Sequence, residues 1–395
     1  MSKNLRMVLV VALLFGLSTG VYEYVLPLFF KANGISYEQI GFIFALAGVA
    51  VVLARLYLGG LSDQLGRKPL YALALLVCGL ASGLSALGAT IIYQAILKTL
   101  RETAALTRET IHPIIIYEEG DEGFLNRIGK LRGIEFLFQA GGTGLAGIII
   151  ARVGAGENAY RVCLAVAGGV LLLAGMWWIA GFEEQHHPAA SKIISLRDLL
   201  NFDLHRNLQL IAIAGVIFTF GVQLSHGFFM VLFFHDRFGL PDNQVAIIMV
   251  IHRLTIALPM LIVGNLKLKN MKGWLISGYI IQGITVLASA VIPHVWIAAA
   301  VFLLHDLIGA GIWSPIQTTM IQRYSRNASR GLEVGKVLTW TSIGSIFGPL
   351  FSGYFATFDV RLPFFASGVI MAVAVIPLFW LNLKLPAPDA AVENV

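Results

Sequence analysis

The chain consists of apolar runs of about 20 residues separated by short turns, and this pattern constrains its fold more than any other feature. A helix of that length matches the hydrocarbon core of a bilayer. The chain is 57% hydrophobic and 13% charged, whereas about 25% of the residues of a soluble domain are charged. We therefore predict an all-α membrane protein. Twelve spans are expected, at about residues 7–30, 39–60, 69–89, 92–117, 131–153, 159–181, 209–234, 243–264, 273–293, 295–322, 334–357 and 362–384.

A polar stretch at residues 182–207 is the expected cytoplasmic linker between two groups of six spans. The predicted domains are therefore an N-terminal six-helix bundle at 1–181 and a C-terminal six-helix bundle at 208–395. The two groups resemble copies of each other, because Gly34-Ile35 recurs as Gly239-Leu240 and Arg132-Gly133-Ile134-Glu135 is echoed by Arg330-Gly331-Leu332-Glu333. An internal duplication of this kind predicts two pseudo-symmetric halves.

The formal charge of +6 could suggest a nucleic-acid partner, but the basic residues lie singly or in small groups at the ends of apolar runs. That distribution indicates membrane topology rather than phosphate binding. With a cytoplasmic N-terminus, 18 Lys and Arg residues fall in inner segments and five in outer turns. Lys3 and Arg6 could open a signal peptide, but apolar character continues to Phe30, which favours a first membrane helix. We expect a multi-pass, monomeric protein of the inner membrane with both termini cytoplasmic and no nucleic-acid partner.

One polar segment, from Gly59 to Lys68, reads G-G-L-S-D-Q-L-G-R-K and is expected to begin where the second helix ends. It resembles the loop between the second and third helices of the major facilitator superfamily of transporters. The resemblance implies twelve transmembrane helices in two six-helix bundles that work by alternating access. It also implies a cytoplasmic latch between the halves, formed by Gly59, Asp63, Gly66, Arg67 and Lys68. Gln64 stands where the family commonly has a basic residue.

The fourth span carries a stripe of ionisable side chains within an arc of about 120°. Charged groups at membrane depth cost several kcal/mol unless they pair or meet water, so this stripe should face the bundle interior or a cavity. The charges could neutralise one another, as Lys98 and Glu102 can at i,i+4, or they could bind substrate, and the two roles are compatible. The stripe comprises Lys98, Arg101, Glu102, Arg108, Glu109 and His112.

Further ionisable residues interrupt other spans, namely Glu23, His226, His252, Arg253, His305 and Asp306. Arg253 and Asp306 both lie near the middle of their spans, which predicts a salt bridge between them. The histidines are candidates for proton coupling, with simple packing as the alternative. His305-Asp306 could also join His226 or His252 as metal ligands, but no established ligand spacing is present, so no resident metal and no cofactor are expected.

The glycines from Gly142 to Gly147 match the G-x-G-x-x-G pattern of dinucleotide sites. They lie inside a predicted span and follow no strand, so they predict close helix packing instead. The fifth span also lacks the Gly-Pro pair that exporters of the superfamily often have.

The sequence predicts a secondary active transporter that moves a small polar or charged solute and is coupled to protons. No G-x-x-x-x-G-K-[ST] loop for ATP and no H-E-x-x-H or G-x-S-x-G constellation is present, so an enzyme is not expected. The alternatives are a drug or metabolite exporter and a transition-metal, iron-like transporter. A non-transporting membrane scaffold or receptor is the alternative of a different class.

Overall fold

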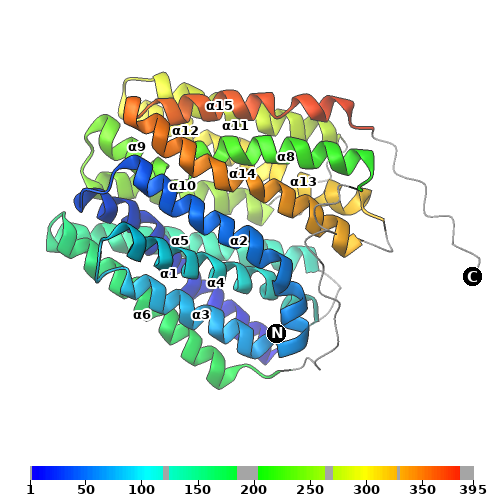
Figure 1. The fold of residues 1–395 in the computed structure, drawn as a ribbon, viewed down its shortest axis with the longest axis horizontal. Coiled ribbons are helices and arrows are strands. Elements are labelled where there is room, and N and C mark those ends of the chain that lie inside the picture. Colours follow the sequence, from blue (N-terminus) through cyan, green and yellow to red (C-terminus); the bar gives the residue numbers. More distant parts are fainter. Residues whose placement is uncertain (1, 119–123, 185–202, 263–269, 327–329, 383–395) are drawn as a thin grey trace, which may run out of the picture.

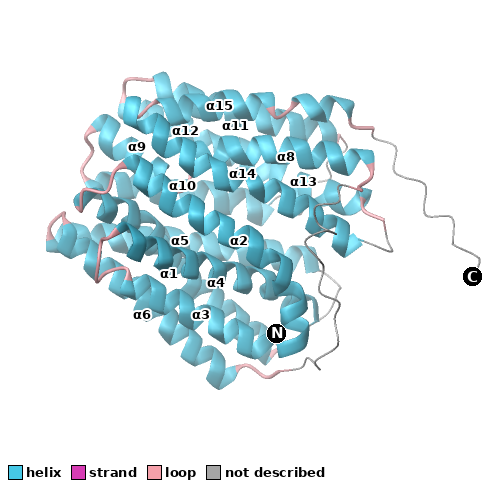
Figure 2. Ribbon diagram, in the orientation of Figure 1, coloured by secondary structure: helices cyan, strands magenta, loops and turns pink. Residues whose placement is uncertain are grey.

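The computed structural model describes residues 2–118, 124–184, 203–262, 270–326 and 330–382. Within these ranges every regular element is helical and no strand occurs (Figure 2). The first half of the chain forms α1 (Lys3–Ala32), α2 (Tyr37–Leu65), α3 (Arg67–Leu84), α4 (Ile91–Glu118), α5 (Phe124–Val153) and α6 (Glu157–Gly181). The second half forms α8 (Arg206–Ser225), α9 (Phe229–Phe238), α10 (Asp242–Ile262), α11 (Met271–Val291), α12 (Val295–Leu304), the π-helix η2 (His305–Ala310), α13 (Gly311–Tyr324), α14 (Arg330–Phe358), α15 (Leu362–Val373) and the 3-10 helix η4 (Ile376–Trp380). The two halves lie side by side (Figure 1).

Helix occupies each of the twelve predicted spans, which confirms the all-α membrane fold. The seventh span is broken between α8 and α9, and the tenth changes from α12 through η2 to α13. In the described part of the chain, nine helices are long and apolar enough to cross a membrane by length and composition. The helix α4 is not among them, because its charged stripe lowers its hydropathy.

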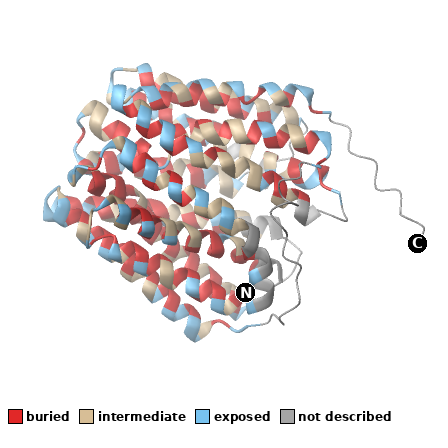
Figure 3. Cartoon of the chain, in the orientation of Figure 1, coloured by how far each residue is buried: buried red, intermediate tan, exposed pale blue. Residues whose placement is uncertain are grey.

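The surface of the bundle is apolar, as a bilayer requires. Buried residues concentrate where helices meet, and exposed ones lie on outward faces and at helix ends (Figure 3). Leu73, Leu173 and Phe379 are more than half exposed to the surroundings of the protein. Large apolar side chains of this kind are stable on a surface that lipid covers.

The same packing pairs occur in both halves. In the first half α1 packs on α5 and α3 packs on α6, and in the second half α8 packs on α14 and α11 packs on α15. Contacts between the halves repeat as well, with α5 against α10 and α14 against α2. This correspondence is what a duplicated six-helix unit produces.

Glycines on α5 allow close approach of helices from both halves, as predicted from Gly142–Gly147. A Cβ atom on Gly142 would lie 2.0 Å from the carbonyl oxygen of Leu17 on α1. A Cβ on Gly147 would lie 2.9 Å from the Cβ of Ala246 on α10. The motif therefore serves helix packing, because only a residue without a side chain fits at Gly142.

The repeated Gly34 and Gly239 have the same conformation. Their φ angles are +74° and +61°, and they follow α1 and α9 respectively. Glycine is favoured in this left-handed region. Gly239 directly follows the last residue of α9, whereas Asn33 separates Gly34 from the end of α1. We call the end of the bundle that holds these two turns the far end, and the end at which α1 begins the N-terminal end.

Candidate functional site

An ion pair joins the two halves near the middle of the bundle. The Nη2 atom of Arg253 on α10 donates to Oε2 of Glu23 on α1. The predicted salt bridge between Arg253 and Asp306 is therefore wrong. Sequence places both residues at a similar depth, but α10 turns Arg253 toward the first half of the chain, where Glu23 is available.

A second charged group lies on α4. Nζ of Lys98 and Nη1 of Arg101 lie 2.6 Å and 3.0 Å from the same Oε1 atom of Glu102. The Arg101 guanidinium also stacks 3.8 Å from the ring centre of Tyr22 and donates to Ser82 Oγ at 3.1 Å. This confirms the predicted i,i+4 pair between Lys98 and Glu102.

Solvent reaches the acids of these two groups more than the bases. The side chains of Glu23 and Glu102 are 40% and 30% exposed, whereas those of Lys98, Arg101 and Arg253 are 6%, 2% and 12% exposed. Neighbours of Glu23 on α1, such as Tyr22 and Tyr24, are buried. The accessible charge at the centre of the bundle is therefore negative.

The lower part of the α4 stripe belongs to the interior of the first half. Arg108 makes a bidentate pair with Glu135 on α5, with bonds of 3.0 Å and 2.8 Å, and its Nε donates to the Tyr71 hydroxyl at 3.3 Å. His112 Nδ1 lies 2.8 Å from the same hydroxyl. Arg108, Glu135 and His112 are all buried, whereas Glu109 is exposed and lies apart from them. The six residues of the stripe thus do not form one site.

The predicted latch segment differs from expectation in its backbone. The second helix was expected to end at Gly59, but α2 continues to Leu65 and includes Asp63. Residues 61–65 contain no glycine or proline, and the helix stops only at Gly66, whose φ is +89°. The Lys68 amide donates to Oε2 of Glu184 at 2.6 Å, just after α6. The side chains of residues 62–64, Asp63 among them, lie outside the described part of the chain. The latch therefore stays a prediction for Gly59, Asp63, Gly66, Arg67 and Lys68.

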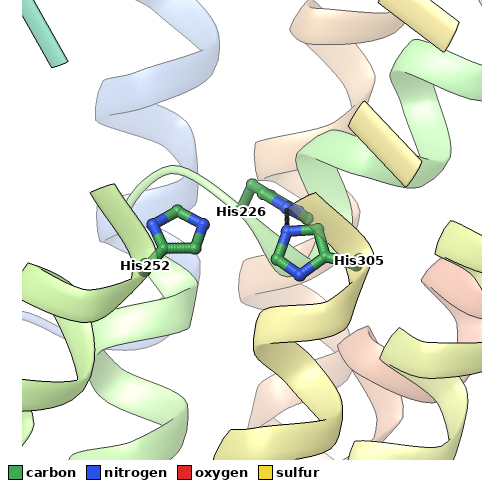
Figure 4. A group of neighbouring side chains, drawn as sticks. All are labelled: His226, His252 and His305. Atoms are coloured by element: carbon green, nitrogen blue, oxygen red, sulfur yellow. Dashed lines mark hydrogen bonds between the residues drawn. The ribbon is translucent and has the colours of Figure 1, made fainter. Parts of the chain in front are cut away.

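Three histidines of the second half converge, although no resident metal was expected from the sequence (Figure 4). His226 lies in the turn after α8, His252 on α10 and His305 at the start of η2. The Nε2 atoms of His226 and His305 lie 2.7 Å apart, and one ring nitrogen of each of the three lies within 4.8 Å of the others. Asp306 Oδ2 lies 2.7 Å from His252 Nε2, and its Oδ1 lies 3.2 Å from His305 Nε2.

A separate network closes the far end between the halves. Tyr37 and Lys31 of the first half contact Asp236, with Lys31 Nζ 3.9 Å from Oδ2. Tyr160 donates to Asp242 Oδ2 at 2.5 Å. His235, which lies beyond the predicted seventh span, contacts Oδ1 of Asp236 at 2.5 Å and Oδ1 of Asp242 at 3.3 Å.

Hydrogen bonds to Asp236 and Asp242 raise the pKa of His235 to about 9. A pocket of about 650 Å³ opens beside this network, lined in part by Tyr160, His235 and Asp242. It lies far along the bundle from the Glu23–Arg253 pair, so we assign it to the far-end closure rather than to the central site.

Sequence reasoning missed several partners. Glu135 was noticed only as part of a repeated motif, and Tyr22, Tyr71 and Asp242 were not singled out. The available signal was that Glu135 and Glu333 occupy the same position in the repeated Arg-Gly-x-Glu sequence. Glu333 also accepts hydrogen bonds, from the Arg326 amide at 2.9 Å and from the Arg326 side chain.

Comparisons with known proteins agree with this fold. A model described as Major Facilitator Superfamily matches residues 270–394. Multidrug resistance protein 2 of Bacillus subtilis (strain 168) is 25% identical, with 96% of this chain and 94% of that protein covered. Multidrug resistance protein 1 of the same organism is 22% identical, with 98% of each covered.

Solved transporter structures share the fold. The nucleoside transporter NupG superposes with a TM-score of 0.74 at 16% identity, covering 97% of this chain and 100% of that one. A bacterial homologue of the human lysosomal transporter Spinster gives 0.73 at 15% identity, covering 96% and 97%. The chain is thus similar to the major facilitator superfamily of membrane transporters, by its family model over residues 270–394 and by its fold over nearly the whole length.

Proposed function

We propose that this transporter moves a small, positively charged solute in exchange for protons, with Glu23 and Glu102 as the acids that receive it. Three bases, Lys98, Arg101 and Arg253, oppose the three acids Glu23, Glu102 and Asp306, so net charge does not indicate the sign of the solute. Accessibility does, because the bases are buried while Glu23 and Glu102 remain 40% and 30% exposed. This difference is the observation that carries the proposal.

Competition at Glu23 provides a mechanism for coupling. Its carboxylate can hold the Arg253 guanidinium, a cationic solute or a proton, and only one of these fully neutralises it at a time. Because Arg253 belongs to the second half, occupation of Glu23 by solute or proton removes an ion pair between the halves. A ligand that binds one arrangement of the halves better shifts the equilibrium toward it.

The orientation in the membrane follows the distribution of Lys and Arg. We propose that the protein lies in the inner membrane with the N-terminal end of the bundle on the cytoplasmic side. We also propose that it acts as a monomer. The far-end network of Tyr37, Asp236, Tyr160 and Asp242 then closes the outer side. By resemblance to the family, Asp63 and Arg67 would close the cytoplasmic side in the opposite state.

Binding and flux measurements test the proposal separately. Cationic solutes should raise the thermal unfolding midpoint of the detergent-purified protein. At 100 times their Kd, the expected gain in the free energy of unfolding is about 2.7 kcal/mol. Matched anions should have no effect. In proteoliposomes with an imposed pH gradient, the same cations should exchange with protons. Stabilisation by anions alone would overturn the assigned charge, and binding without flux would indicate a receptor.

Export of drug-like compounds is the second candidate, and the names of the two Bacillus subtilis relatives favour it. The half-buried ring of Phe44 lies beside Lys98 Nζ and could stack on a flat organic cation. Lipophilic and hydrophilic cations of equal charge distinguish the two candidates. Flux of the lipophilic set alone supports drug export.

A further inference from the structure

We propose that His226, His252, His305 and Asp306 form a binding site for a divalent transition-metal cation of the Zn²⁺ or Co²⁺ class. The three histidines come from the turn after α8, the middle of α10 and the start of η2 (Figure 4). Asp306 follows His305 on η2 and contacts His252. The proposal does not depend on which solute the transporter carries.

The first argument is the orientation of the imidazole rings. His226 Nδ1 lies 3.0 Å from the carbonyl oxygen of Val222, and His305 Nδ1 contacts the carbonyl oxygen of Phe302. A ring that donates its Nδ1–H to a carbonyl keeps a lone pair on Nε2, and metal-binding histidines are commonly held in this way. Ser225 Oγ also lies 2.8 Å from His226 Nδ1. The two Nε2 atoms lie 2.7 Å apart, a separation at which they share a proton or could both coordinate one metal ion.

The second argument is the unmet polar groups at the same place. His252 is 2% exposed, and neither of its ring nitrogens has a hydrogen-bond partner in the described part of the chain. Its Nε2 lies 2.7 Å from Asp306 Oδ2, but the atoms are not aligned for a hydrogen bond, and that oxygen has no other partner among the described residues. Buried polar atoms are rarely left in this state, and a metal ion would coordinate both.

The distances fit a tetrahedral ion after small side-chain movements. Donors that lie about 2.0–2.1 Å from Zn²⁺ in a tetrahedron are about 3.3 Å from one another. The observed separations extend from 2.7 Å for the closest pair to at most 4.8 Å among the three histidine nitrogens. Three imidazole nitrogens and one carboxylate oxygen suit Zn²⁺ or Co²⁺ and not Mg²⁺ or Ca²⁺, which prefer all-oxygen ligands.

The backbone supports the same assignment. The seventh span breaks at His226 and Gly227, where Gly227 has a φ of +64°, and the tenth span forms a π-helix that begins at His305. A π-helical turn inside an α-helix is rare and is frequently found at functional sites. These two irregularities place His226 against His305, and the Phe302 ring, 4.3 Å from the centre of the His305 ring, gives the site an apolar side.

Metal binding to the purified full-length protein tests the proposal. The protein should carry no polyhistidine tag, and a chelator should first remove any bound metal and then be removed itself. Isothermal titration with Zn²⁺ should show one site, and Co²⁺ should produce the visible absorption of a tetrahedral nitrogen–oxygen complex. Mg²⁺ should not compete. The variants His252→Gln and His305→Gln should each weaken Zn²⁺ binding at least tenfold.

A matched control is His235→Gln, because His235 also lies beside two carboxylates. It should bind Zn²⁺ as the unmodified protein does. If a buried variant does not fold, His226→Gln at the half-buried turn provides the same measurement. Absence of Zn²⁺ binding by the folded protein overturns the proposal. Binding that survives in the triple variant His226→Gln, His252→Gln, His305→Gln also overturns it, and so does loss of binding in His235→Gln.

Discussion

Arg253 on α10 and Glu23 on α1 are bound to each other across the two halves of the chain, and Glu23 is the partly exposed member of the pair. A movement that separated the halves at this point would break the pair. Its acid is accessible to solutes and protons, while its base is largely buried. In the proposed mechanism, the pair connects ligand binding with the relative position of the halves.

The first prediction concerns Glu23→Gln. The amide keeps the shape of the side chain but cannot neutralise Arg253 or a cationic solute, so proton-coupled flux in proteoliposomes should fall at least tenfold. Stability should fall by an amount between about 1 kcal/mol, as for exposed ion pairs, and about 3 kcal/mol, because the largely buried Arg253 loses its partner. Flux is therefore compared per amount of folded protein. Glu157→Gln, which removes the exposed pair with Arg161, is the control and should keep normal flux. Normal flux in Glu23→Gln would remove Glu23 from the site.

The second prediction separates the Arg108–Glu135 pair from transport. Both side chains are buried and the bonds are bidentate, so removing one partner leaves an uncompensated charge at a cost of about 3–5 kcal/mol. Arg108→Met and Glu135→Leu should each lower the thermal unfolding midpoint strongly. The double variant should recover part of the loss, because no buried charge remains. A double variant less stable than both single variants would contradict this interpretation.

Much of the fold could be predicted from the order of apolar and polar residues. Run length determines where a chain can cross a bilayer, and the repeated Gly34 and Gly239 both lie in turns and both have a positive φ. Hydropathy could not predict the break at His226 or the π-helix at His305, because one extra residue in a turn hardly changes an apolar average.

The candidate site was predicted less well, for a physical reason. Sequence gives the depth of a residue in its span, but its partner depends on how neighbouring helices are rotated and packed. Arg253 and Asp306 share a depth, yet Arg253 meets Glu23 and Asp306 meets His252 and His305. The i,i+4 pair of Lys98 and Glu102 was predicted correctly because one helix alone determines it.

The third prediction uses two glycines in the first half. A Cβ on Gly142 would lie 2.0 Å from the Leu17 carbonyl oxygen, whereas a Cβ on Gly169 would meet nothing within 4 Å. Gly142→Ala should therefore force α1 and α5 apart and sharply reduce the yield and thermal stability of folded protein. Gly169→Ala should be neutral or slightly stabilising, because alanine favours the helix. Equal stability of the two variants would show that α1 and α5 do not cross this closely.

The fourth prediction is a pH-dependent far end. Hydrogen bonds to Asp236 and Asp242 raise the pKa of His235 to about 9, above the ordinary value of about 6.5. A protonated His235 therefore stabilises the closed far end fully below about pH 6.5, and this contribution is lost as the pH rises through about 9. The other ionisable groups in contact with the carboxylates of these two acids are Lys31, Tyr37 and Tyr160, and the Tyr24 hydroxyl donates to the backbone carbonyl of Asp242.

Spin labels attached at Asn33 and Asn243, in a background without Cys78 and Cys163, can follow this end of the protein by electron–electron double resonance. The distance distribution should be short and narrow at pH 6 and should shift to longer distances at pH 10. In His235→Gln no protonated imidazole forms, so the difference between pH 6 and pH 10 should largely disappear. A distribution in the unmodified chain that is the same at both pH values, or a shift that persists in His235→Gln, would show that His235 does not control the closure.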